Sequence, residues 1–252
     1  MKDIPKISII TVTLNSKKTI KHCIESVINQ NYPKNKIEHI IIDGGSTDGT
    51  VEVIKKYKKH IKYWHSKKDK GLYDAMNTGI KISKGNIIGI LNSDDIFYKN
   101  CFRLVSKYFL IDKIDYLFGS VLKNRVYHNF HPHKIWYTFN IFPSHSVSFF
   151  EKRQTHSING KYDIRFNYSA DRDYIYRLIR NKDLKGISTS KADLFGKFSM
   201  HGLSSTVNFL EKNFEEIKIR IKNKQNIFII LSVLSIFLVY FLFRKIINKA
   251  QF

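Results

Sequence analysis

The chain has 252 residues, 43% of them hydrophobic and 25% charged, so we expect a globular protein with a sizeable core and exclude a disordered chain. Its 43 Lys and Arg residues against 21 Asp and Glu give a net charge of +22, which favours anionic partners such as a membrane face or a phosphorylated molecule. No zinc-finger spacing, RNA-binding signature or helix-turn-helix pattern accompanies the lysines, so nucleic acid is not an expected partner.

The first hundred residues alternate between strand and helix patterns. The runs KISIITVTLN, KIEHIIID, IKYWHS and NIIGIL predict strands, with the helical patterns SKKTIKHCIESVINQ, TVEVIKKYKKH and LYDAMNTGIKIS between them. Ser16 is the expected N-cap of the first helix, and Asp48 or Thr47 that of the second. Such alternation implies parallel strands with crossover helices, so we predict an α/β fold with a doubly wound sheet.

The amino-terminal start and the cysteines give little sign of export. MKDIPKISII has no apolar stretch of signal-peptide length. Cys23 and Cys101 lie far apart without the spacing of metal ligands, which favours reduced thiols in a cytosolic setting.

Acidic residues follow three of the predicted strands. Asp43 ends the second strand, Asp69 follows the third, and Asp94 and Asp95 end the fourth. Because ligands of doubly wound sheets bind beyond the carboxyl ends of the strands, these acids can converge on one crevice. Their oxygens suit hard cations such as Mg²⁺ or Mn²⁺, which commonly bridge carboxylates to a diphosphate. The alternative is that NSDD is only a turn and a helix cap.

No glycine fingerprint for phosphate is present. The segment DGGSTDGT fits neither the dinucleotide pattern of three spaced glycines nor a P-loop. A diphosphate would therefore be held by a metal and by basic side chains, which gives Asp94 added importance.

The second half of the domain is less regular. DYLFGSVLKNRVYHNF predicts a hairpin of strands around residues 123–125, and DLFGKFSMHGLSST predicts a later strand and a glycine turn. The histidines between them are expected to pack or to contact substrate rather than to bind a metal: His131, His133 and His145. A helix should begin near Ser169, with Asp171 and Asp173 in its first turn, where they either serve the site or only complement the helix dipole.

The end of the chain differs in composition. VNFLEKNFEEIKIRIKNK predicts an amphipathic helix whose apolar side carries Phe209, Phe214, Ile217 and Ile221. Residues 227–243 hold no charge over 17 residues, which is the short end for a membrane span. We therefore expect one domain over residues 1–206 and a membrane-anchoring hydrophobic helical tail over residues 207–252. The alternatives are a helix lying in the membrane interface and a buried core helix.

Four segments together resemble a known family. SIITVTLN, IIIDGGSTDGT, DKGLYDAMNTG and GILNSDD occur in the order and spacing of the family-2 glycosyltransferases with the GT-A fold, among which the bacterial enzymes of surface polysaccharides are most similar. The resemblance covers roughly residues 6–204 and implies a GT-A type doubly wound mixed sheet. It also implies inverting transfer of a sugar from a nucleotide diphosphate.

The resemblance implies roles for single residues. Thr13, Asn15 and Asp43 match the positions that hold the nucleotide base, and Asp69 and Asn77 match the segment that flanks the nucleotide.

The metal and the base are implied in the same way. Asp94 matches the acid that binds Mn²⁺ or Mg²⁺, Asn92 replaces the other acid of that motif, and Asp95 is a candidate to assist. Asp171 matches the catalytic base, and Ala170 replaces the acid that often precedes it. PSHSVSFF and HGLSS resemble acceptor-side segments.

Together these features imply a metal-dependent glycosyltransferase of cell-surface polysaccharide biosynthesis on the cytoplasmic face of the cell membrane. The expected partners are a nucleotide-diphosphate sugar, with a UDP-sugar favoured, a saccharide acceptor that is lipid-linked, and the membrane. One alternative is a sugar-nucleotide pyrophosphorylase. Such an enzyme needs a glycine- and arginine-rich phosphate loop near the amino terminus, and the segment ITVTLNSKK is not one. The other is a catalytically impaired, basic membrane- or polyanion-binding module, as Asn92 and Ala170 suggest.

Overall fold

The computed structural model describes residues 4–111, 113–128, 130–199 and 209–249. Its strands are β1 (Ile7–Thr13), β2 (Ile37–Asp43), β3 (Tyr63–Ser66), β4 (Ile87–Asn92), β5 (Ile96–Phe97), β6 (Tyr116–Phe118), β7 (Ser120–Leu122), β8 (Val126–Tyr127), β9 (Phe149–Lys152), β10 (Gly186–Ser188) and β11 (Leu194–Lys197). Its helices are α1 (Ile20–Ile28), α2 (Thr50–Lys56), α3 (Leu72–Ile82), α4 (Cys101–Ile111), α5 (Arg153–Asn159), α6 (Ala170–Arg180), α7 (Phe209–Lys222) and α8 (Ile227–Lys249), with short 3-10 turns η1 (Lys34–Lys36), η2 (Lys58–His60) and η3 (Pro132–Lys134).

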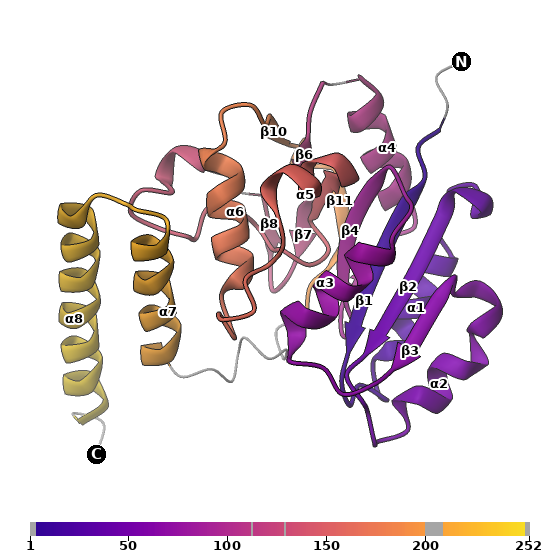
Figure 1. Ribbon diagram of the computed structural model, residues 1–252, viewed down its shortest axis with the longest axis horizontal. Coiled ribbons are helices and arrows are strands. Elements are labelled where there is room, and N and C mark those ends of the chain that lie inside the picture. Colours follow the sequence, from indigo (N-terminus) through magenta and orange to yellow (C-terminus); the bar gives the residue numbers. More distant parts are fainter. Residues whose placement is uncertain (1–3, 112, 129, 200–208, 250–252) are drawn as a thin grey trace.

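The main sheet has the strand order β10-β6-β9-β4-β1-β2-β3 (Figure 1). β1 pairs in parallel with β2 and β4, and β2 with β3, which confirms the parallel core predicted from the alternating pattern. β9 runs antiparallel between β4 and β6, so the sheet as a whole is mixed.

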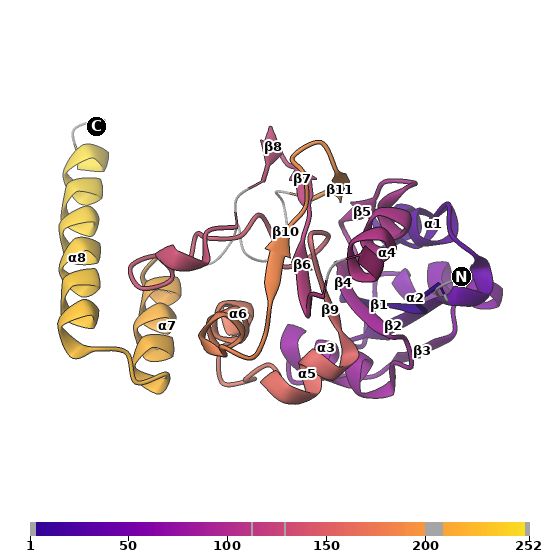
Figure 2. The ribbon, with the colours of Figure 1, turned by 90° about the horizontal axis from the view of Figure 1, so that it is seen from above.

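Helices cover both faces of this sheet. Alternate residues of β1 face opposite ways, so Ile10 packs in one core with α3 and α6, and Ile9 packs in another with α1 and α4. Because both faces are covered, β1, β2 and β4 read as nearly continuous apolar runs. The doubly wound arrangement expected from the sequence is thus confirmed (Figure 2).

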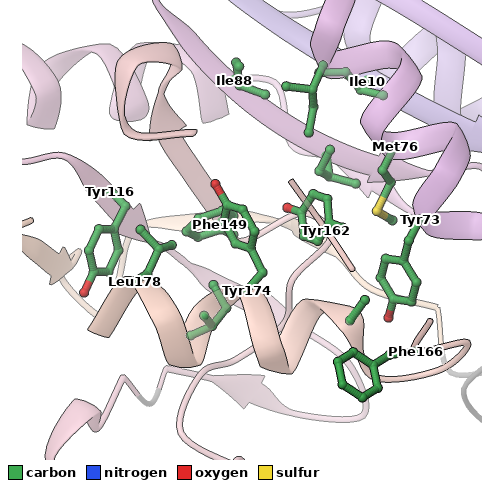
Figure 3. Close-up of a cluster of buried hydrophobic side chains, with 14 of the residues drawn as sticks. Ile10, Tyr73, Met76, Ile88, Tyr116, Phe149, Tyr162, Phe166, Tyr174 and Leu178 are labelled. Atoms are coloured by element: carbon green, nitrogen blue, oxygen red, sulfur yellow. The ribbon is translucent and has the colours of Figure 1, made fainter. Parts of the chain in front are cut away.

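An aromatic layer fixes α6 against the sheet. The rings of Tyr162 and Tyr174 lie 4.4 Å apart, and Phe149 of β9 and Tyr73 of α3 belong to the same cluster (Figure 3). The Tyr174 hydroxyl donates to both oxygens of the buried Glu151 carboxylate, at 2.8 and 2.7 Å, which satisfies a charge placed inside the core. The start of α6 is therefore held at a defined place beside α3.

The chain changes sheets at Gly119. A second sheet has the order β5-β11-β7-β8, and β7 and β8 form the hairpin predicted around residues 123–125. A Cβ at Gly119 would lie 2.2 Å from the Phe195 ring, so a side chain there would displace β11. Glycine lets the chain pass from β6 of the main sheet to β7 of the second one at this close approach.

Two helix starts differ from the predictions. Ser16 is not the N-cap of α1, because a turn over residues 17–19 intervenes and Thr19 takes that place. Ahead of α2, Gly49 is the N-cap, but the Asp48 carboxylate accepts the Thr50 N–H at 3.0 Å. A polar residue before an apolar run marks a helix start only to within a turn of the helix.

Both cysteines are buried and unpaired, as expected for reduced thiols. Burial raises the pKa of both thiols, and the charges of Asp95 and Asp94 add to the effect at Cys23. The Cys23 thiol donates to the Asn92 carbonyl at 3.5 Å, directly beneath the end of β4.

The tail forms an antiparallel helix pair, with α7 lying between α6 and α8 (Figures 1 and 2). The amphipathic helix predicted from its apolar side is α7, and that side does not face the core: Phe214 is 60% and Ile221 59% exposed. The buried positions instead include Ile219 and the charged Glu215, Glu216 and Arg220. Periodicity marks an apolar stripe but does not say which way it faces. The side chain of Phe209 lies outside the described part of the chain.

α8 also exposes large apolar side chains, among them Phe228, Leu231 and Ile236, while Ile230 and Val233 are buried. Within the described residues, no helix combines the length and the apolar character that crossing a membrane requires, so the expected membrane-anchoring tail is not supported as a spanning helix. The predicted domain boundary at residue 206 and the segment HGLSS fall in residues 200–208, outside the described ranges.

Candidate active site

The strand ends predicted to converge lie side by side. Thr13 at the end of β1 is in register with Asp43 of β2, which in turn is in register with Ser66 of β3. Asn92 ends β4 opposite Val12 on the other side of β1. Loops from β1, β2, β3 and β4 therefore meet at one edge of the sheet, the usual ligand edge of such folds.

Asp43 and Asn15 organise the loop that follows β2. The fully buried Asp43 carboxylate accepts the N–H groups of Gly45 at 3.1 Å and Ser46 at 2.9 Å, and the Ser66 hydroxyl at 2.5 Å. Asn15, with a positive φ of 50°, donates its N–H to the Ser46 hydroxyl at 2.7 Å and accepts the Thr47 N–H at 3.0 Å. These two predicted site residues thus shape the loop over residues 44–48, and their contact with a nucleotide base stays a prediction.

Thr13 has a different environment. Its hydroxyl oxygen is buried and has no hydrogen-bond partner within the described part of the chain. A buried polar atom without a partner is costly, so it marks a place where a ligand group would be favourable.

Asp69 and Asn77 flank the start of α3. Asp69 accepts the Gly71 N–H at 2.8 Å, and its other oxygen lies 2.9 Å from where a Cβ of Gly44 would stand. Asp69 is therefore adjacent to the loop after β2, as predicted. Asn77 instead exchanges two hydrogen bonds with the Tyr162 backbone, at 2.9 and 3.0 Å. Its amide joins α3 to the segment before α6, which sequence spacing could not show.

The two acids after β4 occupy unlike environments. Asp95 is 1% exposed and accepts the Ser199 N–H at 2.7 Å, and burial together with the neighbouring Asp94 raises its pKa to about 7. Asp94 is half-buried, and its carboxylate has no hydrogen bond or ion pair among the described residues. NSDD is a turn, as the alternative held, but it is not a helix cap, because α4 begins only at Cys101.

The donor set at this turn suits a cation that arrives with a diphosphate. No group of three or more His, Cys, Asp or Glu side chains that could hold a metal occurs in the described residues. Asp94 offers an open carboxylate. Close to it in sequence, Asn92 Oδ1 and Asp95 Oδ2 are buried and have no hydrogen-bond partner in the part of the chain that the structure describes. Mg²⁺ is commonly held by one or two carboxylates and substrate phosphates rather than by an all-protein cage.

Asp171 lies at the start of α6, where the sequence predicted a helix beginning after Ser169. One oxygen of its half-buried carboxylate accepts the Tyr73 hydroxyl at 3.0 Å and the Arg172 N–H at 2.9 Å. Burial, and then the charge of Asp171, raise the pKa of Tyr73, so its phenol stays a donor. Tyr73 was not predicted as a site residue; it stands in the motif DKGLYDAMNTG, in the first turn of α3.

Asp173, two residues later, faces elsewhere. Its fully buried carboxylate accepts Arg177 Nε at 3.0 Å and Lys222 Nζ of α7 at 2.8 Å. Of the two acids in this helical turn, Asp173 is therefore held in ion pairs, whereas Asp171 is partly exposed and accepts hydrogen bonds at one oxygen.

The segment over residues 144–148 connects the two halves of the site. Ser146 Oγ accepts the Asn92 N–H at 2.9 Å, while the adjacent His145 bonds the Tyr162 hydroxyl at 2.7 Å. Burial lowers the pKa of His145 and the charge of Asp171 opposes that shift, so the imidazole lies within the field of Asp171. His145 stacks on the ring of Phe149, as the expectation of a packing role held.

Comparison with protein families gives a match that covers the candidate site. Residues 8–179 match the family described as Glycosyl transferase family 2. The chain belongs to this family. The resemblance drawn from the four segments is thus confirmed, and the matched range includes every predicted site residue from Thr13 to Asp171.

Family-2 relatives share parts of the chain. An uncharacterized glycosyltransferase of Mycobacterium tuberculosis is 39% identical over 97 residues, covering 38% of this chain and 37% of the relative. The Staphylococcus aureus poly(ribitol-phosphate) beta-N-acetylglucosaminyltransferase TarP is 34% identical over 118 residues, covering 46% and 36%. A Methanococcus voltae dolichyl N-acetyl-alpha-D-glucosaminyl phosphate 3-beta-D-2,3-diacetamido-2,3-dideoxy-beta-D-glucuronosyltransferase is 45% identical over 92 residues, covering 34% and 28%. The matched part thus spans little more than a third of these relatives at most.

Solved structures of other glycosyltransferases share the fold. S. aureus TarS 1-349 in complex with UDP-GlcNAc superposes with a TM-score of 0.68 at 17% identity, covering 86% of this chain and 66% of that one. The mannosyltransferase PcManGT of Pyrobaculum calidifontis, in complex with GDP-Man and Mn²⁺, gives 0.65 at 16% identity, covering 89% and 66%. The mixed α/β fold of the GT-A type is thereby confirmed.

Proposed function

We propose that the protein is an inverting glycosyltransferase that moves a sugar from a nucleotide diphosphate to a saccharide acceptor. The observation that carries the proposal is a set of two carboxylates: Asp94 at the end of β4, without a hydrogen-bond or ion-pair partner among the described residues, and Asp171 at the start of α6, oriented by Tyr73. Tyr73 lies in the first turn of α3, directly after the loop that leaves β3, so Asp171 stands over the strand ends.

Each carboxylate has a separate task in this reaction. Asp94 and the donor diphosphate would hold a Mn²⁺ or Mg²⁺ ion, which neutralises charge on the leaving diphosphate. Asp171 accepts the proton of the acceptor hydroxyl as that oxygen attacks the anomeric carbon. The attack comes from the face opposite the diphosphate, so a single displacement inverts the anomeric configuration.

A UDP-sugar is the proposed donor. The support is the complex of TarS with UDP-GlcNAc, together with the buried Thr13 hydroxyl at the end of β1, which has no partner among residues 4–111, 113–128, 130–199 and 209–249. The PcManGT complex with Mn²⁺ supports the proposed cation. The names of TarP and of the dolichyl-phosphate enzyme support a saccharide polymer or a lipid-linked saccharide as acceptor.

Donor binding tests the proposal directly. A panel of UDP-, GDP- and CMP-sugars, each with and without Mn²⁺, is scored by thermal shift, because a ligand that binds only the folded state raises Tm by mass action. We expect a UDP-sugar to raise Tm in the presence of Mn²⁺. We also expect the protein to release UDP from it slowly when no acceptor is present. No shift with any donor, and no release, would contradict the proposal.

The second candidate is a basic binding module with impaired catalysis. Asn92 stands where the family motif has an acid, and Ala170 where an acid often precedes the base. This candidate predicts a thermal shift without any nucleotide release, so the same panel separates the two.

We further propose that the helix pair lies on the anionic cytoplasmic face of the membrane. The support is the net charge of +22 and the exposed Phe214, Ile221 and Phe228. Trp136 and Tyr137 are also exposed, and Arg220 of α7 donates to the Trp136 carbonyl at 2.8 Å, so these interfacial aromatics adjoin the pair.

Flotation with vesicles tests this second part of the proposal. The full chain should float with phosphatidylglycerol vesicles and less with phosphatidylcholine ones, because each Lys or Arg near an anionic surface contributes about 1 kcal/mol. Absence of binding to both would overturn the membrane proposal and leave the catalytic one standing.

A further inference from the structure

α7 lies outside residues 8–179, the range that matches the family model, yet its inward face is charged and bonded to the start of α6. A helix that only covered a core would turn its apolar side inward, because burying charge carries a large desolvation cost. Here Phe214 and Ile221 face outward, and Glu215, Glu216 and Arg220 are buried. The polar contacts of α7 therefore call for a role beyond covering the core.

Glu215 holds the chain just before α6. Its Oε1 accepts the Asn167 N–H at 2.7 Å and its Oε2 accepts the Tyr168 N–H at 3.0 Å. Both amides precede the N-cap Ser169, so one carboxylate fixes the approach of the backbone to the helix that carries Asp171. Hydrogen bonds of N–H groups to an ionised acceptor are roughly twice as strong as neutral ones.

Glu216 holds the residue next to Asp171. Arg172 Nη1 lies 3.1 Å from Glu216 Oε2, and Arg220 Nη2 lies 2.9 Å from Glu216 Oε1. The guanidinium of Arg172 is thereby drawn toward α7, while its backbone N–H donates to the Asp171 carboxylate.

Lys222 closes the far end of the interface. Its ammonium lies 2.8 Å from both Asp163 and Asp173, and Asn223 donates to the other oxygen of Asp173 at 2.8 Å. Arg165 and Lys222 hold the pKa of Asp163 well below its usual range. Contacts from α7 thus reach residues on both sides of Asp171, from residue 163 to residue 173.

We propose that α7 positions the Asp171 carboxylate for transfer, and that Glu215 is a positioning residue for it. The inference rests on the proposed function, in which Asp171 is the base. Directional ion pairs and hydrogen bonds define one geometry better than apolar contacts do, and a general base misplaced by about 1 Å can cost a factor on the order of 10² in rate. Tyr73 orients the carboxylate from α3, and α7 holds the backbone beneath it.

Glu215→Gln in the full chain tests the inference, with Glu211→Gln as its matched control. The glutamine keeps the shape of Glu215 but turns an amide N–H group toward a backbone N–H. Glu211 lies on the same helix, is exposed, and loses the same charge. Hydrogen exchange by mass spectrometry reports on residues 163–173, and UDP release from UDP-GlcNAc with Mn²⁺ reports on the reaction.

We expect Glu215→Gln to speed exchange in residues 163–173 and to lower kcat about tenfold with the donor KM unchanged, whereas Glu211→Gln changes neither. In an Asp171→Asn background, Glu215→Gln should cause no further loss, because it acts through the missing carboxylate. An equal loss in both backgrounds, or unchanged exchange, would overturn the inference. If no sugar nucleotide of the donor panel is turned over, or Asp171→Asn is fully active, the proposed function fails on its own, and hydrogen exchange still decides whether α7 holds residues 163–173.

Discussion

Asp94 and Asp95 are neighbours whose carboxylates do unlike work. The Asp95 carboxylate is buried and accepts the Ser199 N–H, with a pKa raised to about 7, so much of it is protonated near neutral pH. That reduces the repulsion between the pair and leaves Asp94 as the open carboxylate of the turn. Because Asp94 is the carboxylate of this turn without a partner among the described residues, the proposed metal dependence becomes a question about one residue.

Asp94→Asn should therefore abolish the Mn²⁺ dependence of UDP binding without unfolding the protein, since the side chain holds no described contact. Titration calorimetry with and without Mn²⁺ measures this directly. Asp183→Asn, at an exposed acid far along the chain, serves as the control. Equal metal-dependent affinity in Asp94→Asn and wild type would remove Asp94 from the metal site.

Asp171→Asn and Asp173→Asn should separate chemistry from stability. The first should lower transfer by a factor on the order of 10² or more, with donor affinity and Tm little changed. The second leaves Arg177 and Lys222 facing a neutral amide and should cost on the order of 2 kcal/mol in unfolding free energy. Transfer kinetics, donor binding and urea melts on both variants check this prediction. If Asp173→Asn were as stable as wild type but had lost transfer, Asp173 rather than Asp171 would be the base.

His39 should make the protein sensitive to acid. Burial lowers its pKa to about 3, and its Nε2 pairs with the Thr11 hydroxyl at 2.9 Å, so the folded state keeps it neutral. The unfolded chain takes up the proton below about pH 6.5, so this stability is present above that pH and is lost as pH falls toward 3. Urea melts should show a loss on the order of 3 kcal/mol by pH 4, smaller in His39→Gln. An identical pH profile in that variant would assign the loss to other groups.

The sequence placed candidate site residues correctly only where they end a strand or lie in the first turn of a helix. Asp43, Asp69 and Asp94 could be placed because parallel strands end together, and Asp171 because helix starts leave a readable pattern. Tyr73 could not be found, since its contact with Asp171 joins residues 98 positions apart. For the same reason, the use of Asn77 to hold the Tyr162 backbone depends on packing that no local spacing encodes.

At the scale of elements, α7 shows the limit of periodicity. Its apolar stripe was correctly recognised as a stripe, yet Phe214 and Ile221 face outward while the helix buries Ile219 and charged residues. The burial of charge becomes favourable only because Arg172, Asp173 and the amides before α6 supply partners, and these come from another element. Sequence alone has no means of showing those partners.

Substitutions on the two sides of α7 should have opposite effects. Phe214→Ser with Ile221→Ser should leave the unfolding free energy almost unchanged, because both side chains are mostly exposed, and should weaken flotation with phosphatidylglycerol vesicles. Ile219→Ala, at a fully buried position, should cost about 2–5 kcal/mol while the outward face stays intact. Urea melts and flotation of each variant check this, and unchanged flotation in the serine variant would remove α7 from the membrane contact.

At the scale of the molecule, the parallel core could be predicted because strand and helix patterns alternate. Of the second sheet, only the β7–β8 hairpin and the later strand β11 could be predicted, and their assembly into one sheet with β5 could not. β5, β7, β8 and β11 are short, and their pairing depends on Gly119 letting the chain change sheets beside Phe195. The domain boundary at residue 206 stays a prediction. The ion pairs between α7 and α6 nevertheless argue that α7 acts together with the domain that precedes it.

Truncation tests that division. A chain ending after Asn226 keeps all of α7 and should retain its Tm shift with UDP and Mn²⁺ while losing vesicle flotation. A chain ending after Thr206 lacks the partners of Arg172 and Asp173 and should melt at a lower temperature. Thermal scans of the two chains decide the matter, and equal stability would show that α7 contributes little to the fold.

The burial of Cys23 and Cys101 has a practical consequence for experiments on this protein. Only the thiolate reacts with maleimides or disulfide reagents, and burial disfavours that form at both sites. A dye can therefore be attached through an introduced surface cysteine while both natural thiols are kept. Because the Cys23 thiol contacts the Asn92 carbonyl, the rate at which a thiol reagent modifies Cys23 reports on transient opening of the structure under the Asp94 turn. Bound donor and Mn²⁺ should lower that rate.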